Sequence, residues 1–66
     1  MDQTNTTIRW YLVTVGRAVG VFRDWTNVGP LVLGHSEAVF CKVESRAEGI
    51  RLLREALANG SVRVIG

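Results

Sequence analysis

Residues 32–44 restrict the fold of this chain more than any other stretch, because a short polar loop there leads directly into a strand. Residues 34–37 read Gly-His-Ser-Glu, and the glycine can take the positive φ that a close approach to another molecule requires. The run over residues 38–43 alternates, which puts Phe40 and Lys42 on one face of a strand. An aromatic ring and a cation beside an exposed loop indicate a binding module.

A helix with clear end signals follows this strand. Ser45 and Glu48 stand at the spacing of a capping box, which satisfies two free backbone donors at a helix start. The spacing predicts a helix that runs to about Ala58 and is ended by Gly60 in the left-handed conformation. Its apolar stripe, expected to face the core, consists of Ala47, Ile50, Leu53, Ala56 and Leu57. Arg46, Glu48, Arg51 and Glu55 are expected to face water.

The N-terminal half predicts a hairpin and a short helix. Residues 8–15 and 21–25 are rich in β-branched and aromatic residues, and residues 16–20 have a glycine at each end to close the turn between them. A helix is expected over residues 26–33, with Thr26 or Asn27 as its cap and Pro30 in its first turn. Residues 61–65 form a candidate edge strand. This order of elements predicts an α+β domain.

The length of 66 residues allows one small domain without a deep cavity. Residues 1–7 are expected to be a disordered tail, and residues 8–66 the domain. The single Cys41 cannot form an internal disulfide, which fits a reducing compartment inside the cell, nuclear or cytoplasmic. No stretch is apolar enough for a membrane span, and the polar start is not a signal peptide.

The charge favours an anionic partner only mildly. Eight Lys and Arg residues stand against six Asp and Glu residues, and the formal charge is +2. Seven of the eight cations are arginines, whose planar guanidinium suits phosphate and carboxylate groups. A charge of +2 is nevertheless ordinary for a soluble domain, and dedicated nucleic-acid binders are often more basic.

Few residues could support catalysis. His35 is the single histidine, and no second group at a suitable spacing could orient it. A dyad of His35 and Cys41 is conceivable, but alternation puts Cys41 on the face of Val39 and Val43, where a buried thiol would be inert. The sequence therefore predicts no enzyme activity, no cofactor, no metal site and no small-molecule substrate.

The aromatic residues divide into two groups. Trp10 and Phe22 lie inside expected strands, so we expect them in the core. Trp25 and Phe40 each stand beside a loop or a cation, and the pattern leaves open whether they pack inside or form a contact surface.

The sequence resembles a known family over residues 10–53. WYLVTVGRAVGVFRDW and VLGHSEAVFCKVESRAEGIRLL are similar to the small N-terminal hybrid-binding domain of eukaryotic ribonuclease H. The same domain occurs in caulimovirus viroplasmin proteins and as a stand-alone fungal module. The matching positions are Trp10, Tyr11, Val13, Gly16, Arg17, Gly20, Val21, Phe22, Trp25, Val32, Gly34, Ala38, Phe40, Lys42 and Ser45.

This resemblance implies a three-stranded antiparallel sheet with two helices. It also implies binding to RNA–DNA hybrid or double-stranded RNA across the minor groove, which A-form duplexes present as wide and shallow. Backbone amides of the loop would meet 2′-hydroxyls, Trp25 and Phe40 would pack on sugars, and Tyr11 and Lys42 would hold phosphates. The nucleic-acid-binding residues that it implies are Tyr11, Arg17, Trp25, Gly34, His35, Ser36, Ala38, Phe40 and Lys42.

The sequence departs from the family in several ways. Cys41 replaces a second lysine, basic residues are missing around Thr14, and Glu37 brings an acid into the loop. Each lost phosphate contact lowers affinity. We also expect an apolar sheet face made of Val13, Val15, Val39 and Cys41. Because exposed apolar patches mark interfaces, the alternative function is protein association, most simply as a homodimer through that face.

Overall fold

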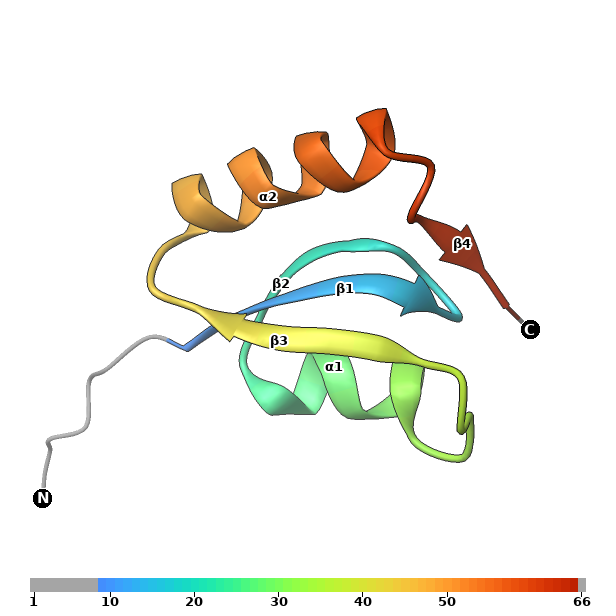
Figure 1. Ribbon diagram of the computed structural model, residues 1–66. Helices are drawn as coiled ribbons and strands as arrows, with labels where there is room; N and C mark the ends of the chain where they lie inside the picture. The colour runs from blue at the N-terminus through green and yellow to red at the C-terminus, as the bar shows by residue number, and fades with distance from the viewer. Residues whose placement is uncertain (1–8, 66) are drawn as a thin grey trace, which may run out of the picture.

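The computed structural model describes residues 9–65, in which a sheet lies between two helices (Figure 1). The expected tail at residues 1–7 lies outside the described residues. The elements in chain order are β1 (Trp10–Gly16), β2 (Gly20–Arg23), α1 (Trp25–Val32), β3 (Val39–Val43), α2 (Arg46–Ala58) and β4 (Arg63–Val64). This arrangement confirms the expected α+β fold.

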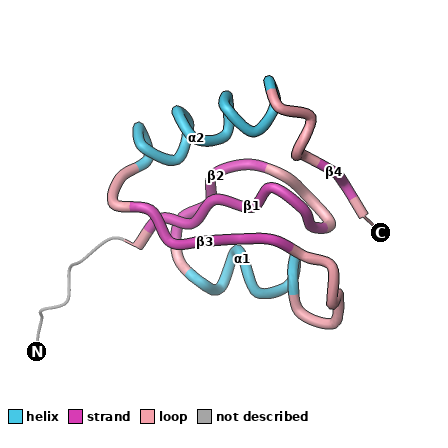
Figure 2. Tube along the Cα trace, in the orientation of Figure 1, coloured by secondary structure: helices cyan, strands magenta, loops and turns pink. Residues whose placement is uncertain are grey.

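The sheet has the strand order β2-β1-β3, and both neighbours of β1 are antiparallel to it (Figure 2). Tyr11 lies opposite Phe22 on one side and Lys42 on the other. A β-bulge follows Val13, which lies opposite Phe40. The expected C-terminal edge strand is present: β4 pairs in parallel with the end of β1, within the same chain.

The core under α1 is built by the residues of β1 that point to that face. Val13 of β1 packs against Val28 and Val32 of α1, and all three are buried. Partly buried side chains surround this cluster, namely Tyr11, Phe22, Leu31 and Ala38. This packing holds α1 against the face of β1 that carries Val13.

The opposite sheet face is covered by α2, which approaches it most closely at Gly49. A Cβ added to Gly49 would lie 2.8 Å from the side chain of Val21 and 3.2 Å from that of Val43. The expected stripe is wrong at two positions, because Ala47 is exposed and Leu57 is 58% exposed.

The predicted cap of α2 is confirmed, with one change. The Ser45 hydroxyl accepts a hydrogen bond from the Glu48 amide at 3.1 Å. The Glu48 carboxylate in turn accepts one from the amide of Glu44 at 2.7 Å, one residue before the N-cap. Gly60 has the expected positive φ, of 69°, just after the helix. Local capping signals therefore set the start and the end of α2.

The passage from β2 into α1 differs from the sequence prediction. The strand ends at Arg23 and the helix begins at Trp25, so the N-cap is Asp24 and not Thr26 or Asn27. Pro30 consequently falls in the second turn of the helix, where it removes one backbone hydrogen bond. Asp24 has a φ of 67°, which turns the chain within a single residue and makes the earlier start possible.

Candidate functional site

Three aromatic rings from three elements meet on the α1 face of the sheet. The ring centroids of Tyr11 in β1 and Trp25 in α1 lie 5.8 Å apart, with the planes at 64°. Those of Trp25 and Phe40 in β3 lie 5.5 Å apart at 47°. The first pair is close to the edge-to-face arrangement that aromatic pairs favour, and the second pair is tilted. We call Tyr11, Trp25 and Phe40 the aromatic cluster.

The aromatic cluster is only partly buried. Trp25 is 41% exposed and Phe40 is 42% exposed, so each ring keeps a surface that a ligand can cover. Trp10 and Phe22, which were expected in the core, are both half-buried, and Phe22 packs against the Val13 cluster. The structure therefore gives Trp25 and Phe40 a surface position.

Lys42 adds a cation to the same face. It lies opposite Tyr11 in the register, so both side chains leave the sheet toward α1. Lys42 is exposed and takes part in no ion pair within residues 9–65. A phenol and a free ammonium group thus stand together at this end of the aromatic cluster, where they can meet an anionic group.

The expectation of a buried Cys41 is wrong. The thiol is exposed, although Cys41 lies opposite Leu12 on the face of the sheet that α2 packs against. The expected apolar face is wrong as well. Val13 and Val15 are buried, and Val13 faces α1 whereas Cys41 faces the other side. A single face containing all four expected residues does not exist.

The loop between α1 and β3 presents several backbone amides. Those of His35 and Ala38 already donate hydrogen bonds, to the carbonyl oxygens of Val32 and His35. The amides of Gly34, Ser36 and Glu37 make no hydrogen bond to another described residue. Gly34 has a φ of 82°, and no atom lies within 4 Å of the place where a Cβ would be. The loop is therefore open to a partner beside Gly34.

The acid of this loop is paired. The carboxylate of Glu37 lies 3.3 Å from the guanidinium of Arg63 in β4, and both side chains are more than half exposed. Sequence reasoning missed this pair, because the partners lie 26 residues apart and nothing in the local pattern joins them. Arg63 offsets the negative charge that Glu37 brings beside the free amides.

Arg17, in the β1–β2 turn, and the side chains of the loop after α1 lie near the C-terminal end of α1. The Arg17 amide donates a hydrogen bond to the carbonyl oxygen of Leu31 at 2.9 Å, which ties the β1–β2 turn to the last turn of α1. Arg17 and Ser36 are exposed, and His35 is half-buried. The predicted residues therefore form a row along the α1 face, from Lys42 through the aromatic cluster to the loop.

The hollow found along α2 is separate from this row. It is lined by Arg46, Ala47, Ile50, Arg51, Arg54 and Glu55, all of which belong to α2. The sheet separates α2 from α1, so this hollow cannot share a ligand with the aromatic cluster (Figure 1). Its rim also combines cations with the carboxylate of Glu55, which is paired with Arg51 at 3.0 Å.

The structural requirements of a metal site and of a membrane-spanning helix can be compared with residues 9–65. This range contains no group of three or more His, Cys, Asp or Glu side chains placed to hold a metal ion. It also contains no helix with the length and apolar character needed to cross a bilayer.

Comparison with known protein families gives a match over residues 9–49, which is more than half of the chain, to the ribonuclease H1 N-terminal domain. The chain belongs to the ribonuclease H1 N-terminal domain family. The family is one of small nucleic-acid-binding domains. The match includes the aromatic cluster, Lys42 and the whole loop, but not Arg63. No curated protein and no solved structure matches the chain.

Proposed function

We propose that this ribonuclease H1 N-terminal domain binds RNA–DNA hybrid or double-stranded RNA across the minor groove, without catalysing a reaction. The observation that carries the proposal is the shared position of Trp25 and Phe40, which lie half-exposed on the α1 face in the row that ends at the loop. A-form minor grooves are wide and shallow and display 2′-hydroxyls, so a flat row of rings and donors suits them.

The loop amides are the proposed donors to 2′-hydroxyl groups. The amides of Gly34, Ser36 and Glu37 have no acceptor within residues 9–65, whereas those of His35 and Ala38 do. His35 and Ala38 would therefore shape the loop instead of donating from the backbone. The open space beside Gly34 allows a ribose to approach the main chain. Since DNA lacks the 2′-hydroxyl, these contacts would favour duplexes that contain RNA.

The aromatic cluster and the cations are the proposed contacts to the rest of the duplex. Trp25 and Phe40 would pack on sugars, and Tyr11 and Lys42 would hold a phosphate at the adjacent position. Arg17 is exposed at the loop end of the row and would make a second phosphate contact. So few cations predict weak binding that falls steeply with salt, because phosphate contacts supply most of the non-specific affinity.

A titration of fluorescent hybrid, double-stranded RNA and double-stranded DNA at low salt tests the proposal. We expect micromolar or weaker affinity for both RNA-containing duplexes and still weaker binding to DNA. Equal binding to all three duplexes would contradict the proposed contact between the loop amides and 2′-hydroxyl groups. Absence of binding to any duplex at low salt would refute the function.

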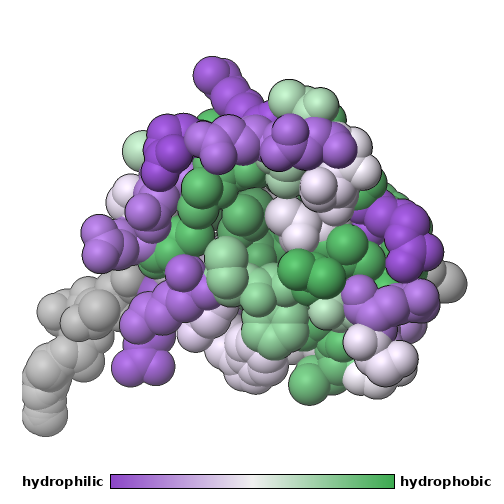
Figure 3. All heavy atoms as spheres, viewed as in Figure 1, coloured by the Kyte–Doolittle hydropathy of each residue, from purple (hydrophilic) through white to green (hydrophobic). Residues whose placement is uncertain are grey.

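A homodimer is the second candidate function, through the outer edge of β3 and not through the face expected from the sequence. No described strand pairs with that edge, and Val39 beside it is 54% exposed. Figure 3 shows apolar residues exposed across the middle of this face of the molecule, and a band of hydrophilic residues above them along α2. Exposed strand edges can pair with a second copy. Sedimentation of a strict monomer at high micromolar concentration would exclude this function.

A further inference from the structure

A single residue, Asp24, separates β2 from α1 and has an unusual backbone conformation. Its φ is 67° and its ψ is 147°. It is the one residue other than glycine with a positive φ in the described range. Side chains clash with the backbone in this region, so a residue stays there only when its surroundings hold it.

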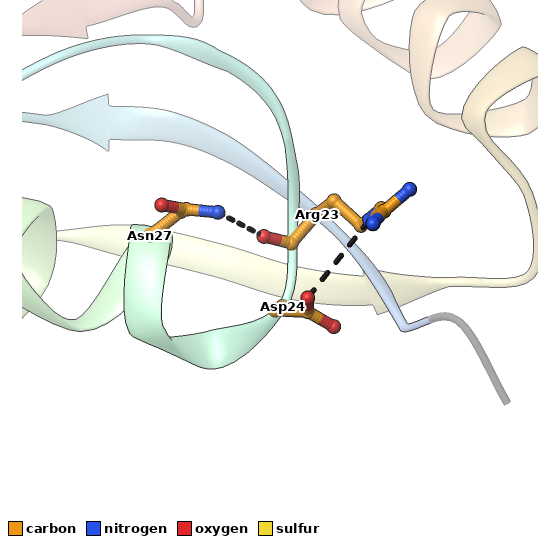
Figure 4. Close-up of polar contacts among 3 residues, drawn as sticks. All are labelled: Arg23, Asp24 and Asn27. Atoms are coloured by element: carbon orange, nitrogen blue, oxygen red, sulfur yellow. Dashed lines mark hydrogen bonds and ion pairs between the residues drawn. The ribbon is translucent and has the colours of Figure 1, made fainter. Parts of the chain in front are cut away.

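Three hydrogen bonds hold the chain on both sides of Asp24. Its amide donates to the carbonyl oxygen of Arg9 at 2.8 Å, and its carbonyl oxygen accepts from the amide of Asn27 at 3.1 Å. The side-chain amide of Asn27 also donates to the carbonyl oxygen of Arg23 at 2.6 Å (Figure 4). The turn is therefore joined to the start of β1, the end of β2 and the first turn of α1.

The side chain of Asp24 contributes little to this arrangement. It makes no capping hydrogen bond to the helix that follows. Its carboxylate lies 3.9 Å from the guanidinium of Arg23, and both groups are more than half exposed. Exposed pairs of this kind are weak. The structural role of residue 24 thus lies in its backbone conformation and not in its charge.

This turn decides where Trp25 lies. Because the chain reverses at Asp24, Trp25 becomes the first residue of α1 and its indole reaches both Tyr11 and Phe40. A residue confined to negative φ would require a longer turn, and the helix would then start later along the chain, as the sequence pattern alone predicts. Trp25 would no longer stand at the edge of the sheet face.

We propose that Asp24 is a positioning residue, whose backbone conformation sets the indole of Trp25 against Phe40 and thereby prepares the site for the duplex. The claim that the site is prepared for the duplex rests on the proposed function. The claim that Asp24 sets the position of the indole concerns the free domain alone, and it can be tested without any ligand.

Substitutions at position 24 separate conformation from charge. Asp24→Gly removes the side chain and allows the positive φ, and Asp24→Asn keeps the shape without the charge. Asp24→Val has a β-branched side chain that strongly disfavours this φ. We expect the Trp25–Phe40 contact and the duplex affinity to be similar with Gly, Asn or Asp at position 24 and lower with Val. A dependence on charge would instead group the three uncharged variants, Gly, Asn and Val, together and apart from Asp.

Nuclear Overhauser contacts between the indole of Trp25 and the ring of Phe40 report the position directly in the free domain. We expect them in Asp24→Gly and Asp24→Asn and not in Asp24→Val, while amide signals of α2 and β1 persist in all three. Hybrid-duplex affinity should stay within about twofold for the first two variants and fall about tenfold for Asp24→Val, the size of one lost aromatic contact.

A double-mutant cycle shows whether Asp24 acts through Trp25. In a Trp25→Ala background, Asp24→Val should cause no further loss of affinity, because the ring that it positions is gone. If Asp24→Val does not fold, Asp24→Ala replaces it, with an expected loss of about threefold, because alanine strains this conformation less than valine does.

Retained Trp25–Phe40 contacts and full affinity in Asp24→Val would overturn the proposal, and so would loss of both in Asp24→Gly. If the unmodified domain binds no duplex, the proposed function fails. The ranking of the Trp25–Phe40 contacts in the free variants then still decides whether Asp24 positions the indole.

Discussion

The indole of Trp25 and the ring of Phe40 lie 5.5 Å apart, centroid to centroid, although Trp25 begins α1 and Phe40 belongs to the edge strand β3. This contact joins the start of the helix to the side of the sheet that has no further strand within residues 9–65. It makes one continuous surface out of two elements that are distant in the sequence. The first prediction concerns this surface.

Replacement of Trp25 by alanine should weaken binding to hybrid duplex by about 1–3 kcal/mol, the range measured when aromatic side chains that stack on nucleic acid are removed. Fluorescence anisotropy with a labelled hybrid measures the change. Leu57→Ala is the matched control, since Leu57 is a large exposed residue on α2 and should leave affinity unchanged. Equal losses in both variants would mean that Trp25 does not contact the duplex.

Lys42→Ala should reduce the dependence of affinity on salt. Removal of one phosphate contact lowers the slope of log affinity against log salt by about 0.7–0.9. Arg51→Ala on α2 removes one positive charge from the opposite side of the molecule and should change the slope much less. An equal change in the two variants would indicate a diffuse electrostatic effect without a specific phosphate at Lys42.

Gly34→Ala and Gly60→Ala form a matched pair. Both glycines have positive φ, of 82° and 69°, and neither has an atom within 4 Å of an added Cβ. Each substitution should destabilise the domain by about 1 kcal/mol through backbone strain, measurable by urea unfolding. Only Gly34→Ala should also weaken duplex binding, because it alters the loop amides. Similar affinities in both variants would contradict the role of the loop.

Gly49→Ala should destabilise the fold without changing the site. The new methyl group would lie 2.8 Å from the side chain of Val21, so α2 must move away from the sheet. Overpacking of this kind costs about 1–3 kcal/mol. Thermal unfolding measures the loss, and affinity measured well below the transition should be unchanged. An unchanged melting temperature would contradict the close contact between Gly49 of α2 and Val21 of β2.

Arg63→Ala should weaken duplex binding about twofold to threefold, within the small range expected for an exposed ion pair. The substitution leaves the carboxylate of Glu37 without its partner beside the free loop amides, where it repels phosphates. Glu37→Gln should restore the affinity in the double variant. If the Arg63→Ala loss persists in the Glu37→Gln background, Arg63 contacts the duplex itself.

Local signals in the sequence predicted the parts of the fold that local chemistry determines. The Ser45–Glu48 spacing located the start of α2 at the correct residue. Alternation in β3 placed Phe40 and Lys42 on one face, and that face is the one toward α1. These predictions succeeded because a capping bond and the alternation of a strand depend on neighbouring residues only.

Other features depend on how the elements pack, and the sequence could not reveal them. Cys41 and Leu57 are both exposed, and strand alternation or helical spacing alone does not distinguish them from buried positions. The start of α1 depends on a positive φ at Asp24, a residue type that adopts such φ only occasionally. The pairing of Glu37 with Arg63 required the parallel strand β4.

The placement of the two helices on opposite sides of the sheet has a practical consequence. A dye or a surface linkage attached to the exposed Arg54 position of α2 would leave the α1 side turned toward the solution. The domain could then be immobilised in one orientation on a sensor chip. Such a surface would report which nucleic acids are captured from a mixture without chemical modification of any of the residues proposed to touch them.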